Sequence, residues 1–156
     1  MIRPLTEGGA INVSPSVSAD GSRLAFASDR SGNPQIYVMP MAGGGARRVT
    51  YQGNYNAAPS LSPKGDKVAY QSRHNGVFDI YVVSTSGGQG TQLTNGAGSN
   101  QEPAWSPDGR YIVFSSNREG AWKLFLMQAD TGKVVSAISE ESGDDTSPAW
   151  SWWIGE

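Results

Sequence analysis

Short apolar runs alternate with turn-forming residues along the whole chain. The runs are about four to six residues long and rich in β-branched and aromatic residues. Asp-Gly, Lys-Gly, Gly-Gly or Asn-Gly sequences separate them. Runs of this length are too short for helices and are typical of antiparallel strands joined by hairpins. The pattern therefore predicts an all-β chain.

The strand pattern repeats along the sequence. A Pro-x-x-Ser motif occurs four times, at spacings of 44, 44 and 45 residues, starting at Pro15, Pro59, Pro103 and Pro148. Each of the first three motifs is followed by a turn and by three further apolar runs. Every repeat therefore holds four predicted strands, named a to d in chain order. The predicted repeats are 15–58, 59–102 and 103–147, with partial strands at 1–14 and 148–156.

A unit of about 40 to 45 residues with four strands has the size of one β-propeller blade. The sequence thus predicts a β-propeller of four-stranded antiparallel blades, with residues 1–156 as a single domain. A β-sandwich has similar strands and is the main alternative, but sandwiches rarely repeat their sequence. The regular spacing favours the propeller.

Composition and charge narrow the function classes. Glycine makes up 20 of 156 residues and charged residues only 17%, which suits a turn-rich β protein. The net charge of −2 lacks the basic excess that binding to a phosphate backbone requires, so we do not expect nucleic acid as a partner. No apolar stretch approaches the ~18 residues of a membrane span, and the first residues lack the apolar core of a signal peptide. We expect no membrane insertion, and nothing in the sequence as written exports the chain.

Candidate catalytic chemistry is sparse. His74 is the only histidine and the chain has no cysteine, so neither a histidine-cluster metal site nor a Cys-His pair can be assembled. A Ser-His-Asp triad around His74 would need a nucleophile elbow, and no Gly-x-Ser-x-Gly sequence is present. His74 also occupies the position that Arg30 and Arg118 hold in the other repeats, which favours a polar loop residue over a base. We expect no enzyme activity, no cofactor and no metal.

Other polar clusters have structural interpretations. Asp20 and Asp108 lie in the predicted a–b turns, where Asp before Gly is ordinary turn chemistry. An acidic run, Glu140, Glu141, Asp144 and Asp145, suggests calcium, but its spacing departs from that of an EF-hand and favours a solvated loop. The glycine-rich segments 43–45 and 87–90 fall between strands c and d, and we interpret them as hairpin turns rather than phosphate cradles.

The loops that differ between repeats predict a binding surface. In an up-and-down blade, the b–c and d–a connections emerge on one face of the disc. Arginine, tyrosine and asparagine on rigid turns suit protein recognition. The candidate partner-binding residues on this face are Arg30, Arg73, His74, Arg118, Tyr55, Asn100, Glu102 and Asp145. The alternative is that Arg30 and Arg118 brace neighbouring loops through backbone carbonyls.

The repeat motifs resemble those of a known family. The Pro-x-Trp-Ser-Pro-Asp-Gly opening at Pro103, the segment from Ser28 to Val38, the Gly-Gly turns and the closing Leu-Thr are similar to blades of the C-terminal β-propeller of the TolB family, a WD-type repeat. The resemblance covers nearly the whole chain. It implies a non-enzymatic protein–protein interaction scaffold of the periplasm, which works with the Tol-Pal system of the cell envelope and binds the peptidoglycan-associated lipoprotein.

The resemblance also implies about half of a six-bladed ring, because TolB propellers have six blades behind a smaller N-terminal domain. Three blades alone would leave two sheet faces uncovered. We therefore expect two chains to close head to tail as a homodimer, with the terminal strands 3–6 and 148–151 at the junctions. The alternatives are an unnatural fragment, or a four-bladed monomer whose last blade is built from both termini.

Two further hypotheses stay open at this stage. Trp150, Trp152 and Trp153 either form an apolar plug between blades or belong to a cloning or truncation boundary. The blade motif also occurs in propellers of prolyl-oligopeptidase-like peptidases, so the chain is alternatively an accessory propeller of such an enzyme. A self-assembling propeller fragment with no retained ligand is the third alternative for its function.

Overall fold

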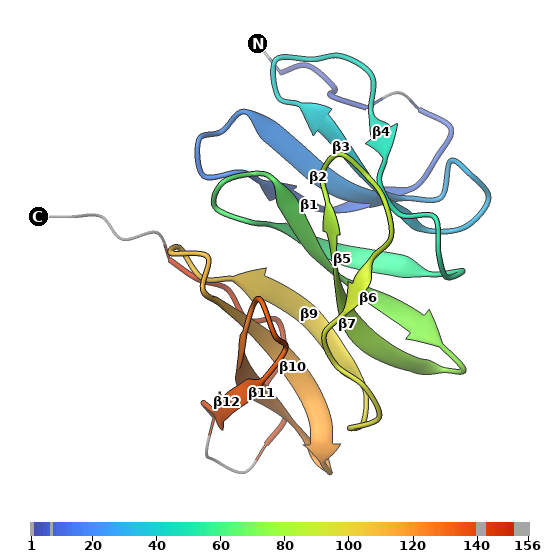
Figure 1. Ribbon diagram of the computed structural model, residues 1–156. Coiled ribbons are helices and arrows are strands. Elements are labelled where there is room, and N and C mark those ends of the chain that lie inside the picture. The colour runs from blue at the N-terminus through green and yellow to red at the C-terminus, as the bar shows by residue number, and fades with distance from the viewer. Residues whose placement is uncertain (1, 7, 140–142, 152–156) are drawn as a thin grey trace, which may run out of the picture.

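Three four-stranded antiparallel sheets follow one another along the chain in a computed structural model, which describes residues 2–6, 8–139 and 143–151 (Figure 1). The strand order within each sheet is the order in the sequence, so every blade is an up-and-down meander. The predicted all-β fold with four strands per repeat is confirmed. None of the described residues forms a helix long and apolar enough to cross a membrane.

Each sheet forms one blade. The first blade comprises β1 (Asn12–Val17), β2 (Arg23–Ser28), β3 (Gln35–Pro40) and β4 (Arg47–Arg48). The second comprises β5 (Asn56–Leu61), β6 (Lys67–His74), β7 (Val77–Ser84) and β8 (Thr91–Gln92). The third comprises β9 (Asn100–Trp105), β10 (Tyr111–Glu119), β11 (Ala121–Gln128) and β12 (Val134–Ala137). The first strand of each blade begins at an asparagine three residues before the proline of the repeat motif.

A β-bulge interrupts the first strand of every blade. The pairing register shifts within β1, β5 and β9, and a residue with positive φ precedes the proline each time: Ser14 (54°), Ala58 (48°) and Glu102 (54°). A bulge leaves one residue unpaired and bends the strand, so the same kink recurs at the same place. Ser147 has the same geometry, with φ of 56° before Pro148.

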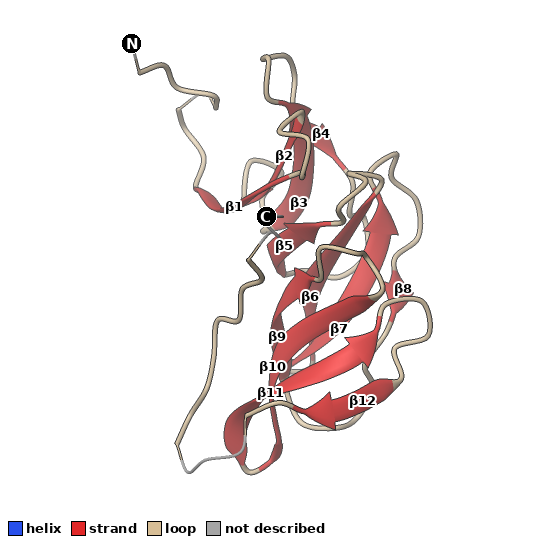
Figure 2. Cartoon of the chain, turned by 90° about the vertical axis from the view of Figure 1, so that its left-hand side faces the viewer, coloured by secondary structure: helices blue, strands red, loops and turns tan. Residues whose placement is uncertain are grey.

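The segment that begins at Ser147 therefore takes the backbone shape of a fourth first strand, although it is not assigned as one. It returns alongside β9 (Figure 2). There, Glu102 Oε2 accepts a hydrogen bond from Ser147 N at 2.6 Å, and Ala104 O accepts one from Trp150 Nε1 at 3.1 Å. Trp150 is 40% exposed, so an apolar plug between blades stays a prediction, and Trp152 and Trp153 lie outside the described residues.

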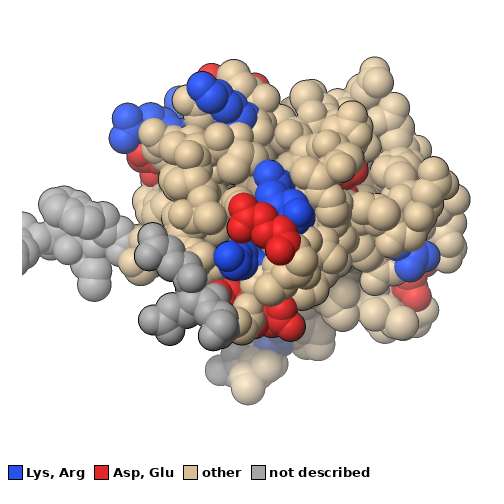
Figure 3. Space-filling model, turned by 90° about the horizontal axis from the view of Figure 1, so that it is seen from below, with Lys and Arg blue, Asp and Glu red and all other residues tan. Residues whose placement is uncertain are grey.

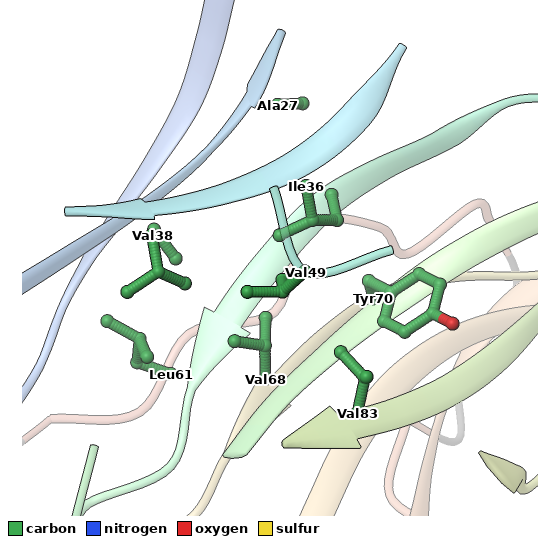
Figure 4. Packing of buried hydrophobic residues seen from close by; sticks show 9 residues of the cluster. Ala27, Ile36, Val38, Val49, Leu61, Val68, Tyr70 and Val83 are labelled. Atoms are coloured by element: carbon green, nitrogen blue, oxygen red, sulfur yellow. The ribbon is translucent and has the colours of Figure 1, made fainter. Parts of the chain in front are cut away.

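Apolar side chains fill the space between successive blades. The first interface joins Ala25, Ala27, Ile36 and Val38 of the first blade to Leu61, Val68, Tyr70 and Val83 of the second (Figure 4). The second interface joins Ala69 and Ile80 to Trp105, Ile112, Phe114, Phe125 and Met127. Small residues on one sheet face larger ones on the next, and this complementary packing fixes the blades side by side.

The N-terminal segment differs from the prediction. Residues 2–6 form no strand, and Arg3 instead donates from Nη2 to Ala42 O at 3.1 Å. This segment lies near the outer face of the first blade, which carries the buried cluster of Leu24, Phe26, Tyr37 and Met39. A predicted d strand over 3–6 would need a neighbouring c strand to pair with, and none of the described residues supplies one.

Candidate functional site

The b–c and d–a loops lie together on one edge of the blades, as predicted. Backbone hydrogen bonds join them: Asn56 N donates to Pro34 O at 2.9 Å, and Arg73 N donates to Tyr55 O at 3.0 Å. The third blade follows the same scheme, since Asp145 N donates to Trp122 O at 2.8 Å. Each b–c hairpin is thus anchored to the loop that leads into or out of its blade, and the face is built on rigid turns.

Arg30 and Arg118 occupy matching positions and make matching contacts. The Arg118 guanidinium carbon lies 4.6 Å from the Phe125 ring centroid and 5.1 Å from that of Phe114. Its Nε donates to Ser116 Oγ at 3.0 Å and its Nη2 to Asn100 Oδ1 at 2.8 Å. Burial of this guanidinium lowers the pKa of Arg118.

In the first blade, Arg30 repeats every contact. It stacks on Tyr37 and Phe26 at 4.7 and 5.2 Å, and it donates to Ser28 Oγ at 3.0 Å and to Asn12 Oδ1 at 2.9 Å. Both arginines therefore brace the start of a b–c hairpin. They do so through side-chain oxygens and aromatic rings of their own blade, not through the backbone carbonyls of neighbouring loops that the alternative interpretation assumed.

The asparagines that begin the strands link adjacent blades. Asn100 Nδ2 donates at 3.1 Å to Oδ1 of Asp79 in the preceding blade, which also accepts a hydrogen bond from Thr94 Oγ1 at 2.7 Å. One blade earlier, Gln35 Oε1 accepts from Asn56 Nδ2 at 2.8 Å. Asn100 is fully buried. It was predicted to lie on the exposed face, but it lies beneath that face because its amide is shared between two blades.

The middle blade breaks the pattern, because His74 stands where the other blades have arginine. Its Nε2 lies 3.2 Å from Ser72 Oγ, and its ring tilts against Tyr81 at 5.8 Å between centroids. The fully buried Asn56 Oδ1, the counterpart of the oxygen bound by Arg118, has no hydrogen-bond partner. A surface pocket of about 470 Å³ opens here, next to the stacked rings of Tyr70 and Tyr81. Burial raises the pKa of both Tyr70 and Tyr81.

Two arginine–tyrosine pairs involve the loop that leads into the middle blade. The Arg73 guanidinium lies 5.1 Å from the Tyr55 ring, which packs edge-on against Phe78 at 5.8 Å. Arg48 lies 4.9 Å from the ring of Tyr51, which is 64% exposed. The predicted residues Arg73, His74 and Tyr55 thus come from the hairpin and entry loop of one blade.

Glu102 and Asp145 hold the C-terminal segment against the third blade through hydrogen bonds. Besides the bond from Ser147 N, Glu102 accepts one from Ser147 Oγ at 3.1 Å and one from Ser115 Oγ at 3.3 Å. Asp145 is held by its backbone, while Asp144 Oδ1 accepts a hydrogen bond from Trp122 N at 2.9 Å. The Glu102 carboxylate is therefore occupied by intramolecular bonds rather than directed outward.

The remaining polar clusters are turn elements. Asp20 and Asp108 each accept a hydrogen bond from a serine hydroxyl, Ser18 or Ser106, at 2.6 Å, and this bond contributes most to lowering the pKa of each carboxyl to about 2. Among the described residues no group of three or more His, Asp or Glu side chains could hold a metal ion. Glu140 and Glu141 of the acidic run lie outside the described residues. On the face seen in Figure 3, basic and acidic groups lie next to each other and most of the surface carries neither.

Sequence reasoning missed the tyrosine pair and the amides around the pocket. Gln52, Gln89 and Gln92 line it beside Tyr70 and Tyr81. A position-by-position comparison of the repeats could have found this site. The middle blade has Tyr70 where the other blades have Phe26 and Phe114, and it has Gly90 where the first blade has Ala46.

Comparisons with known proteins point to one family. A family model described as the TolB beta propeller domain matches residues 1–154. The fold of putative TolB from Agrobacterium tumefaciens superposes with a TM-score of 0.79 and 32% identity, over 86% of this chain and 48% of that one. TolB from Acinetobacter baumannii gives a TM-score of 0.80 and 28% identity, over 96% of this chain and 37% of that one. The chain thus spans less than half of either structure.

Two curated relatives match shorter segments. A protein TolB homolog from Chlorobium luteolum is 43% identical over 45 residues, which are 29% of this chain and 10% of that protein. Tricorn protease homolog 1 from Streptomyces coelicolor is 38% identical over 58 residues, 32% of this chain and 5% of that protein. The blade sequence is therefore shared between TolB-type proteins and a protease homolog.

Proposed function

The chain belongs to the TolB beta propeller domain family, and we propose that it acts as a non-enzymatic protein–protein interaction module. The observation that carries this proposal is the paired arrangement of Arg73 on Tyr55 and Arg48 on Tyr51 around one loop, the entry to the middle blade. Planar cations on tyrosine rings offer large contact areas at a small loss of side-chain freedom, which is why arginine and tyrosine are enriched in the centres of interfaces.

By its similarity to TolB proteins, we place this activity in the periplasm, within the Tol-Pal system of the cell envelope. The proposed partner is the peptidoglycan-associated lipoprotein. The support is the family match over residues 1–154 together with the two TolB structures. A rigid face made of anchored loops suits such a partner, because binding would require little ordering of the loops.

A binding assay tests the partner. The soluble domain of the lipoprotein is immobilised, and its affinity for the chain is measured by interferometry with Arg73→Ala and Tyr51→Ala variants. We expect each variant to weaken binding roughly tenfold, about 1.4 kcal/mol. Asp130→Ala, an exposed change on the turn between β11 and β12, is the matched control and should bind like the wild type. Binding that neither Arg73→Ala nor Tyr51→Ala affects would remove this loop from consideration.

We also propose that the ring closes through a second copy of the chain, giving six blades. The apolar residues Ile11, Val13 and Val17 at one end and Val135 and Ile138 at the other are 45–64% exposed. Both interfaces inside the chain already join one blade face to the next in the same way, so a head-to-tail pair needs no new type of packing.

The solution mass tests closure. Light scattering during size-exclusion chromatography should give about 33 kDa, twice the 16.5 kDa of one chain, across a dilution series. A constant mass of 16.5 kDa would contradict the homodimer and favour either the open fragment or the four-bladed monomer.

The match to a tricorn protease homolog supports a second candidate, an accessory propeller beside a peptidase domain. This candidate predicts no affinity for the lipoprotein and a measurable affinity for a separately expressed peptidase domain. Absence of binding to both proteins would support the third alternative, self-assembly without a ligand.

A further inference from the structure

The middle blade contains an arginine site without its arginine. In both other blades a guanidinium lies over two aromatic rings and bonds to a serine oxygen and an asparagine oxygen. The middle blade keeps the rings, the serine and the asparagine as Tyr70, Tyr81, Ser72 and Asn56, while His74 replaces the arginine. The imidazole reaches Ser72 Oγ but leaves Asn56 Oδ1 unpartnered.

The orientation of the Asn56 amide is fixed by its neighbours. Its Nδ2 donates to Gln35 Oε1 at 2.8 Å and to Gln52 O at 2.7 Å. If the amide were flipped, Oδ1 would lie against these two acceptor oxygens and could form neither hydrogen bond. Oδ1 is therefore the amide atom that has no hydrogen-bond partner. A buried acceptor of this kind is destabilising unless a donor reaches it.

Glycine at position 53 keeps a side chain away from this oxygen. An added Cβ would lie 3.5 Å from Asn56 Oδ1, 3.7 Å from His74 Cε1 and 2.9 Å from Ser72 Oγ, too close to the hydroxyl to fit without a shift. Ser72 and His74, which lie next to this oxygen, also line the pocket of about 470 Å³, together with Tyr70, Tyr81, Gln52, Gln89 and Gln92. The size falls within the range of small-ligand sites. His74 is exposed, so its ring is free to turn toward solvent.

We propose that this pocket binds a guanidinium group supplied from outside the chain. A planar cation would stack on the tyrosine rings, as Arg30 and Arg118 do in the neighbouring blades, and would donate to Asn56 Oδ1 and Ser72 Oγ. An ammonium group fits less well, because it is a compact donor that matches neither the flat stacking geometry nor the fork of two acceptors. The inference goes beyond the proposed function, since it concerns the ligand chemistry of the isolated chain.

A titration followed by NMR tests the site. The probes are methylguanidinium, the peptide Ac-Gly-Arg-Gly-NH2, the same peptide with lysine, and the same peptide with citrulline. We expect saturable shifts of the Asn56 side-chain amide and of the Tyr81 ring with both guanidinium probes, at least about fivefold weaker binding of lysine, and none of citrulline. Equal responses to arginine and lysine, or shifts that do not saturate, would overturn the proposal.

The two guanidinium probes distinguish the source of the ligand. Tighter binding of the arginine peptide than of methylguanidinium indicates an arginine side chain of a protein. Equal binding indicates a small guanidinium compound. Both outcomes support the site, and neither depends on whether the lipoprotein binds, so failure of the proposed function and failure of this inference are separable.

Substitutions provide the second arm. His74→Arg installs the guanidinium within the chain, as in the other two blades, and should abolish binding of the peptide while raising the melting temperature. Ser136→Arg, exposed on β12 of the third blade, adds the same charge on another blade and should leave binding unchanged. Tyr81→Leu removes a ring and should weaken binding severalfold. Retained binding in His74→Arg would overturn the proposal.

Discussion

Arg118 donates a 2.8 Å hydrogen bond to Asn100 within the third blade, and the amide of the same asparagine donates to Asp79 of the second blade. A loop arginine is thus connected to the interface between two sheets. Arg118, Asn100, Asp79 and Thr94 thus form one polar network at the edge of the apolar core, in which each side chain is hydrogen-bonded to another member.

Loss of Arg118 should destabilise the fold. Arg118→Ala leaves Asn100 Oδ1 unpartnered and uncovers the rings of Phe114 and Phe125, so we expect a loss of about 1–3 kcal/mol in the free energy of unfolding. Arg118→Lys should restore little of it, since an ammonium neither stacks flat nor bonds two oxygens in a fork. Urea denaturation measures both, with Arg110→Ala as the exposed control. Equal stability of Arg118→Ala and Arg110→Ala would contradict the network.

Gly90 and Tyr70 should be coupled. A Cβ at Gly90 would clash with the Tyr70 hydroxyl, whereas the first blade combines Ala46 with Phe26 at the same positions. Gly90→Ala should therefore cost about 1–3 kcal/mol by overpacking.

The double variant Gly90→Ala/Tyr70→Phe is the decisive comparison, because it recreates the combination of the first blade. It should recover most of the lost stability, giving a clearly non-additive thermodynamic cycle. Additive losses in thermal unfolding would show that the hydroxyl is not what excludes the methyl group.

Serine hydroxyls on the first strands of the blades should stabilise the contacts between blades. Ser16 Oγ accepts a hydrogen bond from Leu61 N at 3.0 Å, and Ser60 Oγ accepts one from Trp105 N at 3.2 Å. Ser60→Ala leaves a backbone donor of the next blade without its partner, and we expect a loss of about 1 kcal/mol. Ser136→Ala, exposed on β12, should change the unfolding midpoint little. If both variants unfold alike, these bonds contribute nothing to blade association.

Stability should fall in acid through two turn carboxylates. The pKa of Asp20 and of Asp108 is about 2 in the folded chain, below the ordinary 3.8, so their ionised forms favour folding above pH 3.8, and this contribution disappears as the pH falls through about 2. In the double variant Asp20→Asn/Asp108→Asn, the unfolding midpoint should depend less on pH between pH 5 and pH 2 than in the wild type.

The second repeat supplies the control for this pH dependence. Lys64 occupies the position of Asp20 and Asp108 but carries no carboxyl group. Lys64→Asn should therefore keep the acid dependence of the wild type. The two carboxyls would not be responsible if the double variant lost stability as steeply as the wild type over this pH range.

The sequence by itself determined the strands and their grouping. Alternating short apolar runs, turn residues and a spacing of 44 or 45 residues are local properties, and hairpin pairing follows from them with little freedom. The proline that follows each bulge was visible in the sequence, but the bulge and its positive φ emerged only from the structure.

Only the tertiary structure decided which way the polar side chains point. Arg30 and Arg118 stack on rings of their own blade and donate to asparagines 18 residues away, and Asn100 donates to Asp79, 21 residues away. These contacts depend on strand register and on the packing of the next blade. The same holds for the unpartnered oxygen of Asn56. His74 was visible in the sequence as an exception among the repeats. Only the packed blades show its consequence, which is a buried oxygen without a donor beside two tyrosine rings.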